Sequence, residues 1–199
     1  SFLSATQRYL EVFYFMQQSS RKKILDPSAI NRSIIRLAHE ILERNNVVDE
    51  IILIGILTRG EPLAKRLQSH IKKISGFKIP IGTLDITFHR DDFRERFVVP
   101  QVQGTNIDDD INDKTLILID DVLYTGRTVR AAMDELHSFG RPNKIQLAVL
   151  VDRGHREVPI RADFVGANIP THDGEHVKVE LKEVDGKDFV TLINHKDEK

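Results

Sequence analysis

The stretch that decides the fold reads Leu116-Ile117-Leu118-Ile119-Asp120-Asp121-Val122-Leu123-Tyr124-Thr125-Gly126-Arg127-Thr128. It begins as a run of branched apolar residues, which is typical of a β-strand covered on both faces. Two adjacent carboxylates follow, then a short loop with hydroxyl groups and a glycine, and then a helix start. In open α/β sheets, ligands bind beyond the carboxyl ends of the strands, where helix amides favour an anion. The stretch therefore predicts an α/β domain with a ligand site at this strand end.

The composition of the loop indicates which ligand it binds. Gly126 lets the backbone approach a phosphate closely, and Thr125 and Thr128 add hydroxyl donors. A phosphate alone does not require Asp120 and Asp121, and the alternative for this pair is a helix cap or a solvated acidic turn. The pair is explained if the ligand also carries sugar hydroxyls, or a magnesium ion that joins the two. A phosphorylated ribose with a metal-bound diphosphate satisfies both requirements.

Strands and helices alternate on both sides of this stretch. Upstream, Asp26 and Pro27 start a helix whose apolar residues recur every three or four positions as far as about Asn45. The apolar patterns along the chain predict strands at 51–56, 79–88, 115–119 and 145–151, helices at 62–74 and 127–139, and smaller strands at 160–165, 177–181 and 189–193. This alternation is typical of a mainly parallel sheet flanked by helices.

Length and composition limit the classes of function. The 199 residues include no cysteine, which excludes a disulfide framework and a Cys-ligated zinc site. Twenty-nine basic and thirty acidic residues give a net charge of -1, which argues against binding of nucleic acid by bulk charge alone. This balance conceals two basic stretches, at 21–44 and 141–161. No apolar run approaches the ~18 residues of a membrane helix, and we expect a cytoplasmic protein.

Two segments depart from the α/β pattern. We expect residues 1–20 to be an N-terminal extension, because Ser1 is not a start residue and Met16 directly precedes a polar segment. The native domain would then begin near Met16 or shortly after it, and we take the domain as 21–199. The alternative for the extension is an extra helix packed on the domain. Residues 90–114 are polar and too long for a plain connector, which predicts a mobile functional flap.

Three separated segments carry a resemblance to a known family. They read Leu84-Asp85-Ile86-Thr87-Phe88-His89-Arg90-Asp91-Asp92, Asp121-Val122-Leu123-Tyr124-Thr125-Gly126-Arg127-Thr128 and Val151-Asp152-Arg153-Gly154-His155-Arg156-Glu157. In order and spacing they resemble the pyrimidine-operon attenuation regulator and uracil phosphoribosyltransferase family. The likeness runs from about Lys23 to the C-terminus. It implies a type I phosphoribosyltransferase fold, an α/β fold with a mainly parallel sheet, a flap and a small hood at about 160–199.

The resemblance implies a reaction and a role for each matching residue. The reaction joins uracil to 5-phosphoribosyl 1-diphosphate, giving UMP and diphosphate, with Mg²⁺ bound through the diphosphate and no dedicated set of protein ligands. The residues implied in catalysis are Asp120 and Asp121 at the ribose, Arg59 in the pyrophosphate loop and Arg90 on the flap. The implied substrate-binding residues are Thr58, Arg59, Gly60, Asp120, Asp121, Val122, Leu123, Tyr124, Thr125, Gly126, Arg127, Thr128, Arg153 beside the base, and Val177 in the hood. Directly before the flap, Phe88 and His89 replace the usual Leu-Tyr.

Family members in some bacteria also bind a stem-loop of pyrimidine-operon messenger RNA. The matching positions here are Arg36, His39, Arg156 and Arg161, whose side chains can donate to splayed bases and phosphates. Two departures weaken the match, because Ile35 stands where the family usually has Thr and Ala167 where it usually has Lys. For Arg36 and His39 the alternative is a solvated helix face.

Three functions follow from these observations. The first is a uracil phosphoribosyltransferase that also regulates pyrimidine-operon transcription in response to UMP. The second is an RNA-binding transcriptional attenuator with weak or no catalysis. The third keeps the transfer reaction but uses a purine or orotate as the base. The resemblance also implies a homo-oligomer, a dimer or larger.

Overall fold

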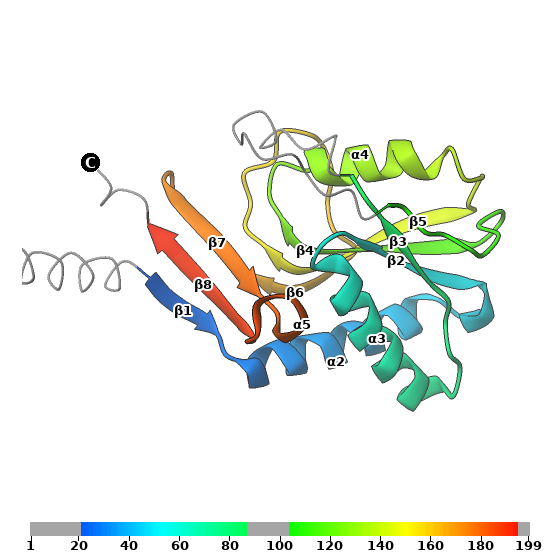
Figure 1. The fold of residues 1–199 in the computed structure, drawn as a ribbon, viewed down its shortest axis with the longest axis horizontal. Coiled ribbons are helices and arrows are strands. Elements are labelled where there is room, and N and C mark those ends of the chain that lie inside the picture. Colours follow the sequence, from blue (N-terminus) through cyan, green and yellow to red (C-terminus); the bar gives the residue numbers. More distant parts are fainter. Residues whose placement is uncertain (1–20, 87–103, 195–199) are drawn as a thin grey trace, which may run out of the picture.

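The computed structural model describes residues 21–86 and 104–194 (Figure 1). The expected extension at 1–20, and the greater part of the flap with Arg90, Phe88 and His89, lie outside the described residues.

A five-stranded parallel sheet forms the centre of the domain, in the order β3-β2-β4-β5-β6. Its strands are β2 (Ile51–Ile56), β3 (Ile81–Leu84), β4 (Thr115–Leu123), β5 (Lys144–Asp152) and β6 (Phe164–Asn168). The chain places β3 on one side of β2, whereas β4 lies on the other side, so the strand order reverses between β2 and β4. Ligands of such sheets bind in the crevice outside the carboxyl ends of the strands at this reversal. The fold thus directs attention to the ends of β2 and β4.

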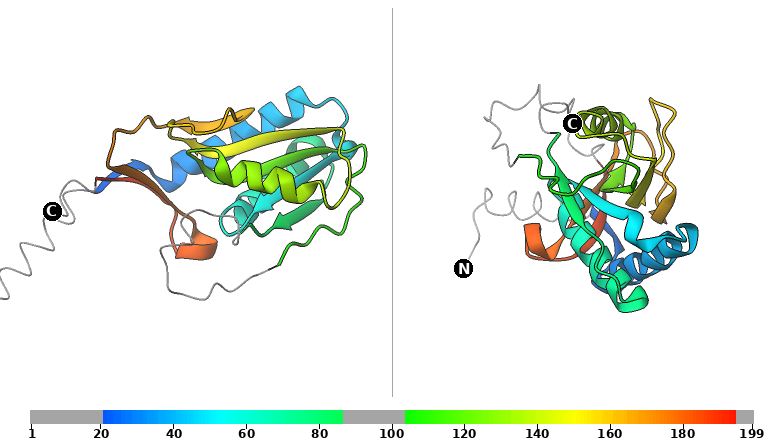
Figure 2. Two further views of the ribbon diagram at one scale, coloured as in Figure 1. Left: turned by 90° about the horizontal axis from the view of Figure 1, so that it is seen from above. Right: turned by 90° about the vertical axis from the view of Figure 1, so that its right-hand side faces the viewer.

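Helices cover both faces of the sheet (Figure 2). Helices α2 (Pro27–Arg44) and α3 (Gly60–Ser75) lie on one face, and α4 (Arg127–Leu136) lies on the other. As predicted, the carboxylate of Asp26 caps α2 by accepting the amide of Ala29 at 2.7 Å. A short 3-10 turn (Val48–Glu50) then leads into β2.

Two hydrophobic clusters fill the space between the sheet and its helices. One joins α2 and α3 to the sheet, for example through Ile34 and Leu67, and the other joins α4 through Val129 and Leu136. All six residues of β2 are buried, which explains its continuous apolar sequence, since both faces of a parallel strand are covered. None of the helices among the described residues has the length and apolar character needed to cross a membrane.

A second, three-stranded antiparallel sheet forms the hood (Figure 1). Its order is β1-β8-β7, with β1 (Arg21–Leu25), β7 (Glu175–Glu180) and β8 (Phe189–Asn194), and the short helix α5 (Lys182–Asp185) joins β7 to β8. Val179, Leu181 and Val190 are buried in the same cluster as α2 and α3. The hood is therefore packed onto the domain through its own apolar residues.

Several predicted boundaries differ from the structure because long-range contacts set them. The strand expected at 160–165 is β6, at Phe164–Asn168, and it belongs to the main sheet rather than to the hood. Ile160 and Ala162 pack against the α4 cluster from a loop, so their apolar pattern does not reflect a strand. The Asp163 carboxylate holds this loop by accepting the amide of Leu147 at 2.9 Å.

Other differences concern the ends of elements. β1 is absent from the sequence-based prediction because its residues are charged and largely exposed, and its partner β8 is distant in the chain. β3 is shorter than the predicted strand at 79–88, and α4 ends at Leu136 rather than 139. β4 is longer than predicted, because its pairing with β5 continues to Leu123.

Candidate active site

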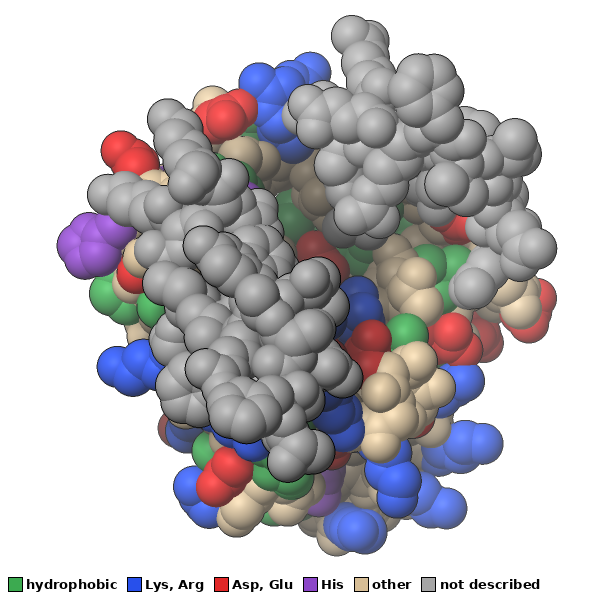
Figure 3. All heavy atoms as spheres, turned by 60° about the vertical axis from the view of Figure 1, so that its left-hand side comes forward, with side chains coloured by type: hydrophobic (Ala, Val, Ile, Leu, Met, Phe, Trp, Pro, Cys, Tyr) green, Lys and Arg blue, Asp and Glu red, His purple; other side chains and the backbone are tan. Residues whose placement is uncertain are grey.

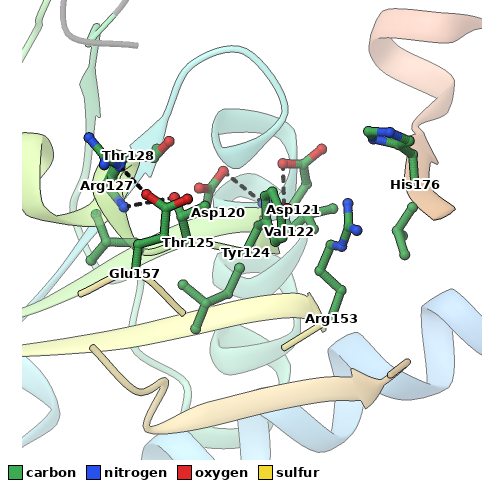
Figure 4. A pocket seen from close by; sticks show the side chains of 14 residues that line it. Asp120, Asp121, Val122, Tyr124, Thr125, Arg127, Thr128, Arg153, Glu157 and His176 are labelled. Atoms are coloured by element: carbon green, nitrogen blue, oxygen red, sulfur yellow. Dashed lines mark hydrogen bonds and ion pairs between the residues drawn. The ribbon is translucent and has the colours of Figure 1, made fainter. Parts of the chain in front are cut away.

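The acidic pair lies inside β4, not in the loop after it. Asp120 is opposite Val149 of β5, and the pairing continues beyond the pair through Val122. Asp120 is only 6% exposed, and its Oδ1 accepts the backbone N–H of Asp121 at 2.9 Å. Asp121 Oδ1 accepts the N–H of Val122, also at 2.9 Å (Figure 4). Because a paired strand carries both carboxylates, their positions are fixed more firmly than in a free loop.

The loop after β4 forms a cradle at the N-terminus of α4. Gly126 has φ 89°, a conformation that favours glycine, and a Cβ there would lie 2.7 Å from Val158 Cγ2. The Thr125 carbonyl accepts the amide of Glu157 at 2.9 Å, and the Thr125 hydroxyl accepts the amide of Arg127 at 3.3 Å. The first amides of a helix and its dipole favour an anion. The loop is therefore braced from outside, and it places the N-terminus of α4 at the wall of a pocket.

Arg153, after the end of β5, forms another wall. The residue is 6% exposed. Its Nε donates to Thr171 Oγ1 at 3.2 Å, and its Nη2 donates to the Glu175 carbonyl at 2.6 Å. The ring of Tyr124 covers the guanidinium, with 4.0 Å between the ring centroid and Cζ. Burial lowers the pKa of Arg153 from its usual value, yet a guanidinium stays protonated in proteins. The result is a flat cation of fixed orientation at the hood side of the site.

These walls enclose one pocket of about 700 Å³. Figure 4 shows the acidic pair at the end of β4, with the Arg127–Glu157 pair on one side and Arg153 and His176 on the other. The lining residues are Asp120, Asp121, Val122, Leu123, Tyr124, Thr125, Gly126, Arg127, Thr128, Val129, Arg153, Glu157, His176 and Val177. Every predicted substrate-binding residue from 120 to 128, with Arg153 and Val177, is among them.

Three lining residues are absent from the sequence-based prediction: Val129, Glu157 and His176. Glu157 ends the third family-like segment, and it forms an ion pair with Arg127 Nε at 2.6 Å. His176 is the neighbour of the predicted Val177, on the strand β7. For Glu157 and His176 the signal was adjacency to predicted residues. The fold brings them to the pocket by different routes: the Glu157 amide donates to the Thr125 carbonyl at 2.9 Å, whereas His176 comes with β7 of the hood.

The predicted pyrophosphate loop, Thr58-Arg59-Gly60, follows β2 and lies beside β4, but its residues do not line the pocket. The Leu57–Thr58 peptide bond is cis. A Cβ on Gly60 would lie 2.3 Å from the Ile119 carbonyl oxygen, immediately before Asp120. The loop is therefore in backbone contact with the residue that precedes the acidic pair, although the sequence separates them by about sixty residues.

Arg59 forms a two-point ion pair with Asp185 of α5. Nε donates to Oδ2 at 3.0 Å and Nη2 donates to Oδ1 at 2.7 Å. These bonds raise the pKa of Arg59 against the opposing effect of burial, and the charge of Asp121 raises it further. In the space-filling view, acidic and basic side chains lie next to one another in the central recess (Figure 3).

Comparison with known proteins gives this arrangement its family. The family described as Phosphoribosyl transferase domain matches residues 20–184. The chain belongs to the phosphoribosyltransferase family. It is 54% identical over 172 residues to the Bifunctional protein PyrR of Clostridioides difficile (strain 630), covering 86% of this chain and 97% of that protein. It is 57% identical over 171 residues to the Bifunctional protein PyrR of Bacillus pumilus (strain SAFR-032), covering 85% of this chain and 95% of that protein.

Solved structures place the fold in the same group. A hypoxanthine-guanine phosphoribosyltransferase from Bacillus anthracis is similar with a TM-score of 0.67, at 19% identity, covering 86% of this chain and 97% of that one. A hypoxanthine phosphoribosyltransferase from Trypanosoma cruzi also has a TM-score of 0.67, at 18% identity, covering 87% and 91%. The prediction of a type I phosphoribosyltransferase fold is confirmed. The identification of a phosphoribosyltransferase of the pyrimidine-operon regulator kind is confirmed as well.

The residues of the phosphoribosyltransferase that match RNA-binding positions form two groups near β6. Arg36, on α2, donates through Nη2 to the carbonyls of Val165 and Gly166 and pairs with Glu40 at 2.7 Å. It is therefore attached to β6 and not only solvated; His39 is exposed on the same helix.

Arg156 and Arg161 precede β6 in the chain. Together with Asn168 they line a second pocket of about 470 Å³. Arg161 is exposed, whereas Arg156 donates to the carbonyls of Tyr124, Gly154 and Ile160 and to the carboxylate of Asp152. Arg156 thus joins the loop of the first pocket to the wall of the second.

The site of the phosphoribosyltransferase suits a magnesium ion only in part. Asp120 and Asp121 supply carboxylate oxygens, the ligands that Mg²⁺ prefers. In residues 21–86 and 104–194 there is no group of three or more His, Asp or Glu side chains placed to hold a metal ion. These oxygens fit a metal that takes its remaining ligands from a bound diphosphate and water.

Proposed function

We propose that the protein transfers the 5-phosphoribosyl group of 5-phosphoribosyl 1-diphosphate to N1 of uracil, forming UMP and diphosphate. One observation carries the proposal: a single pocket of about 700 Å³ brings together an acidic pair, a helix N-terminus and a fixed buried arginine. Each element suits a different part of the two substrates. The acidic pair suits ribose hydroxyls, the helix N-terminus suits the 5′-phosphate, and the arginine suits the base.

The donor is held at two places that the fold keeps apart. The cradle from Thr125 to Thr128 receives the 5′-phosphate, with the amides of α4 as donors. Asp120 and Asp121 accept hydrogen bonds from the ribose hydroxyls, which orients C1 of the sugar toward Arg153 and the hood. Much of the rate in such a reaction comes from holding the two reactants in line.

Charge development explains the remaining residues. As the bond from C1 to the diphosphate breaks, positive charge grows on the ribose and negative charge grows on the leaving group. The carboxylate of Asp121 stabilises the positive charge on the ribose. Arg59, with Arg90 from the flap, stabilises the negative charge on the leaving diphosphate. A diphosphate-bound Mg²⁺ supplies further stabilisation of the leaving group. His176 and Val177 cover the pocket from the hood and reduce the access of water, which competes with the base.

Uracil recognition rests on Arg153 and the hood. The Arg153 guanidinium is fixed by Thr171 and by the carbonyl of Glu175, and Tyr124 stacks on it. A fixed planar donor suits a carbonyl oxygen of a flat pyrimidine, and the backbone near Val177 provides polar groups for the edge of the base. A purine or orotate is the competing base. Initial rates with uracil, hypoxanthine, guanine and orotate distinguish these cases, with uracil expected to give the largest kcat/KM.

Asp121→Asn tests the site assignment. We expect a loss of uracil turnover of about 100-fold or more, because an amide cannot replace a carboxylate charge beside a developing cation. The measurement is UMP formation followed by absorbance. The matched control is Asp134→Asn, on the exposed face of α4, where the side chains of Asp134 and Arg130 are 73% and 69% exposed; this variant should keep wild-type rates. Wild-type activity in Asp121→Asn would overturn the assignment.

A UMP-responsive RNA-binding function is the second candidate, and β6 favours it. Arg36 reaches this edge strand from α2, the helix that also carries His39, and Arg161 lines a pocket with Asn168, the last residue of β6. Residues of both basic stretches thus contribute to the surface around β6. We propose that this surface binds the stem-loop of pyrimidine-operon messenger RNA in the cytoplasm. A homo-oligomer, which sedimentation equilibrium would measure, would repeat the surface.

Electrophoretic shifts of a pyrimidine-leader stem-loop, with and without UMP, test this function. A shift that UMP strengthens supports the proposal, and the absence of a UMP-dependent shift ends it. Arg161→Ala should weaken binding by about fivefold or more, as expected for one good polar contact. Arg130→Ala, on exposed α4, removes the same charge elsewhere and should leave the shift unchanged. An RNA shift without uracil turnover would instead identify an attenuator that lacks catalysis.

A further inference from the structure

We propose that Asp185 is an internal competitor of the phosphoribosyl donor: it occupies the binding edge of Arg59, and the diphosphate must displace it. The proposal rests on the role of Arg59 in diphosphate binding given above. It adds a residue of the hood that sets the affinity for the donor and connects hood and pyrophosphate loop.

The contact between the two side chains has the geometry that Arg59 would use for a phosphate. Nε and Nη2 donate as a parallel pair to the two oxygens of Asp185, at 3.0 and 2.7 Å. A guanidinium binds carboxylates and phosphates through the same two-pronged edge. While Asp185 occupies this edge, it is closed to the diphosphate. In agreement with this, Arg59 is not among the residues that line the pocket.

Asp185 keeps its place without help from Arg59. Its Oδ2 also accepts the backbone N–H of Leu181 at 2.8 Å, and its side chain is only 17% exposed. The turn that carries Asp185 has its own anchor, because Arg66 pairs with Glu183 at 2.6 Å and with Asp188 at 2.7 Å. Arg59 is the longer and more exposed partner. Opening of the pair is therefore a rotation of Arg59 toward the pocket, with the hood unmoved.

The local charges also indicate exchange. Three carboxylates raise the pKa of Arg59 against the opposing effect of burial: Asp185 in contact, and Asp121 and Glu180 at longer range. A diphosphate brings several negative charges toward the same cation. The binding free energy of the diphosphate is reduced by the free energy needed to separate Arg59 from Asp185. Without Asp185, the Arg59 edge would be open and the donor would bind more tightly.

Calorimetric titration with Mg²⁺-pyrophosphate and with 5-phosphoribosyl 1-diphosphate tests the proposal. Asp185→Asn keeps an oxygen for the Leu181 amide but removes the charge, and we expect Kd to fall about three- to fivefold, the upper part of the range for a partly exposed ion pair. Glu183→Gln removes the same charge from the same turn but from Arg66, and it should leave Kd within about twofold. An unchanged or larger Kd in Asp185→Asn would show that Asp185 orients Arg59 or only stabilises the turn, and would overturn the proposal.

Two further measurements separate competition from other effects. In an Arg59→Ala background, Asp185→Asn should no longer tighten binding; equal tightening would mean a general charge effect and would refute the exchange. In the wild-type protein, whose folding is not in question, pyrophosphate should shift the ¹⁵N NMR signal of Arg59 Nε, because this nitrogen exchanges one partner for another. An unchanged signal would also refute the exchange of partners. A wild-type protein that binds neither ligand refutes the proposed function itself, whereas binding without tightening in Asp185→Asn refutes only the competition.

Discussion

Gly60→Ala is the sharpest test of how the fold builds the site. Gly60 begins α3 directly against β4, where its Cβ would lie 2.3 Å from the carbonyl oxygen of Ile119. Real Cβ atoms essentially never approach closer than 3.0 Å, so the two backbones must separate by about 0.7 Å. The atoms that a Cβ of Gly60 would meet belong to the backbones of Ile119 and Gly55, not to a flexible side chain. The loop with Arg59 must therefore move away from the strand that carries Asp120.

The expected effect on stability is small because two contributions oppose each other. Crowding of a packed interior costs about 1–3 kcal/mol, whereas replacing glycine by alanine in a helix returns up to about 1 kcal/mol. The expected effect on catalysis is large, because a misplacement of about 1 Å at a catalytic group can cost about 100-fold. We therefore expect kcat/KM for uracil transfer to fall about 30- to 100-fold, while the free energy of unfolding falls by about 2 kcal/mol or less.

The assay is initial-rate kinetics with each substrate varied, alongside urea denaturation of the same samples. Gly76→Ala is the matched control at the other end of α3. There a Cβ meets nothing within 4 Å, but φ is +80°, so alanine is strained by about 1 kcal/mol. This variant should lose stability and keep wild-type kinetics. A Gly60→Ala protein with kcat/KM within about threefold of wild type would refute the reasoning from the Gly60 contact.

Two other predictions concern the hood side of the site. Tyr124→Ala removes the ring that covers Arg153, and the KM for uracil should rise about fivefold, as an exposed cation–π contact implies. Tyr124→Phe keeps the ring and should have a KM near that of the wild type. Equal KM values for the two variants in initial-rate assays would contradict this prediction. Hydrogen bonds from Arg66 lower the pKa of Glu183, and they lower that of Asp188 against the opposing effect of burial. Groups with a lowered folded pKa stabilise the protein above their unfolded pKa of about 4, and this stabilisation is lost as the pH falls. Arg66→Ala should therefore reduce the free energy of unfolding, measured by urea denaturation, by about 1 kcal/mol at pH 7 and by much less near pH 3. The value at pH 7 is discounted for the exposure of Glu183. An equal loss of stability at both pH values would exclude the ion pairs as the cause.

The sequence predicted the local parts of the site because their signals are local. A buried strand, two carboxylates and a glycine turn before a helix occupy thirteen consecutive residues. Their chemistry therefore needed no knowledge of distant contacts. The capped start of α2 at Asp26 and the apolar strand β2 were predictable for the same reason, since capping and burial leave their pattern in neighbouring residues.

Tertiary structure decided what depends on pairs far apart in the chain. The placement of β6 in the main sheet, and the assignment of the charged β1 to the hood, depend on which strands meet; neither is visible in a short apolar pattern. The same holds for Arg156, whose hydrogen bonds reach back to the carbonyl of Tyr124.

Arg59 shows the division most clearly. The resemblance of Thr58-Arg59-Gly60 to the family's pyrophosphate loop implied a cation for the diphosphate, and that role stays a prediction. The ion pair of Arg59 with Asp185, 126 residues away, could not be predicted, because a charged side chain has many possible partners in an extended chain. Only the packing of the hood against the end of the sheet selects one of them. The residues thus determined which chemistry is present, and the fold determined which charges meet.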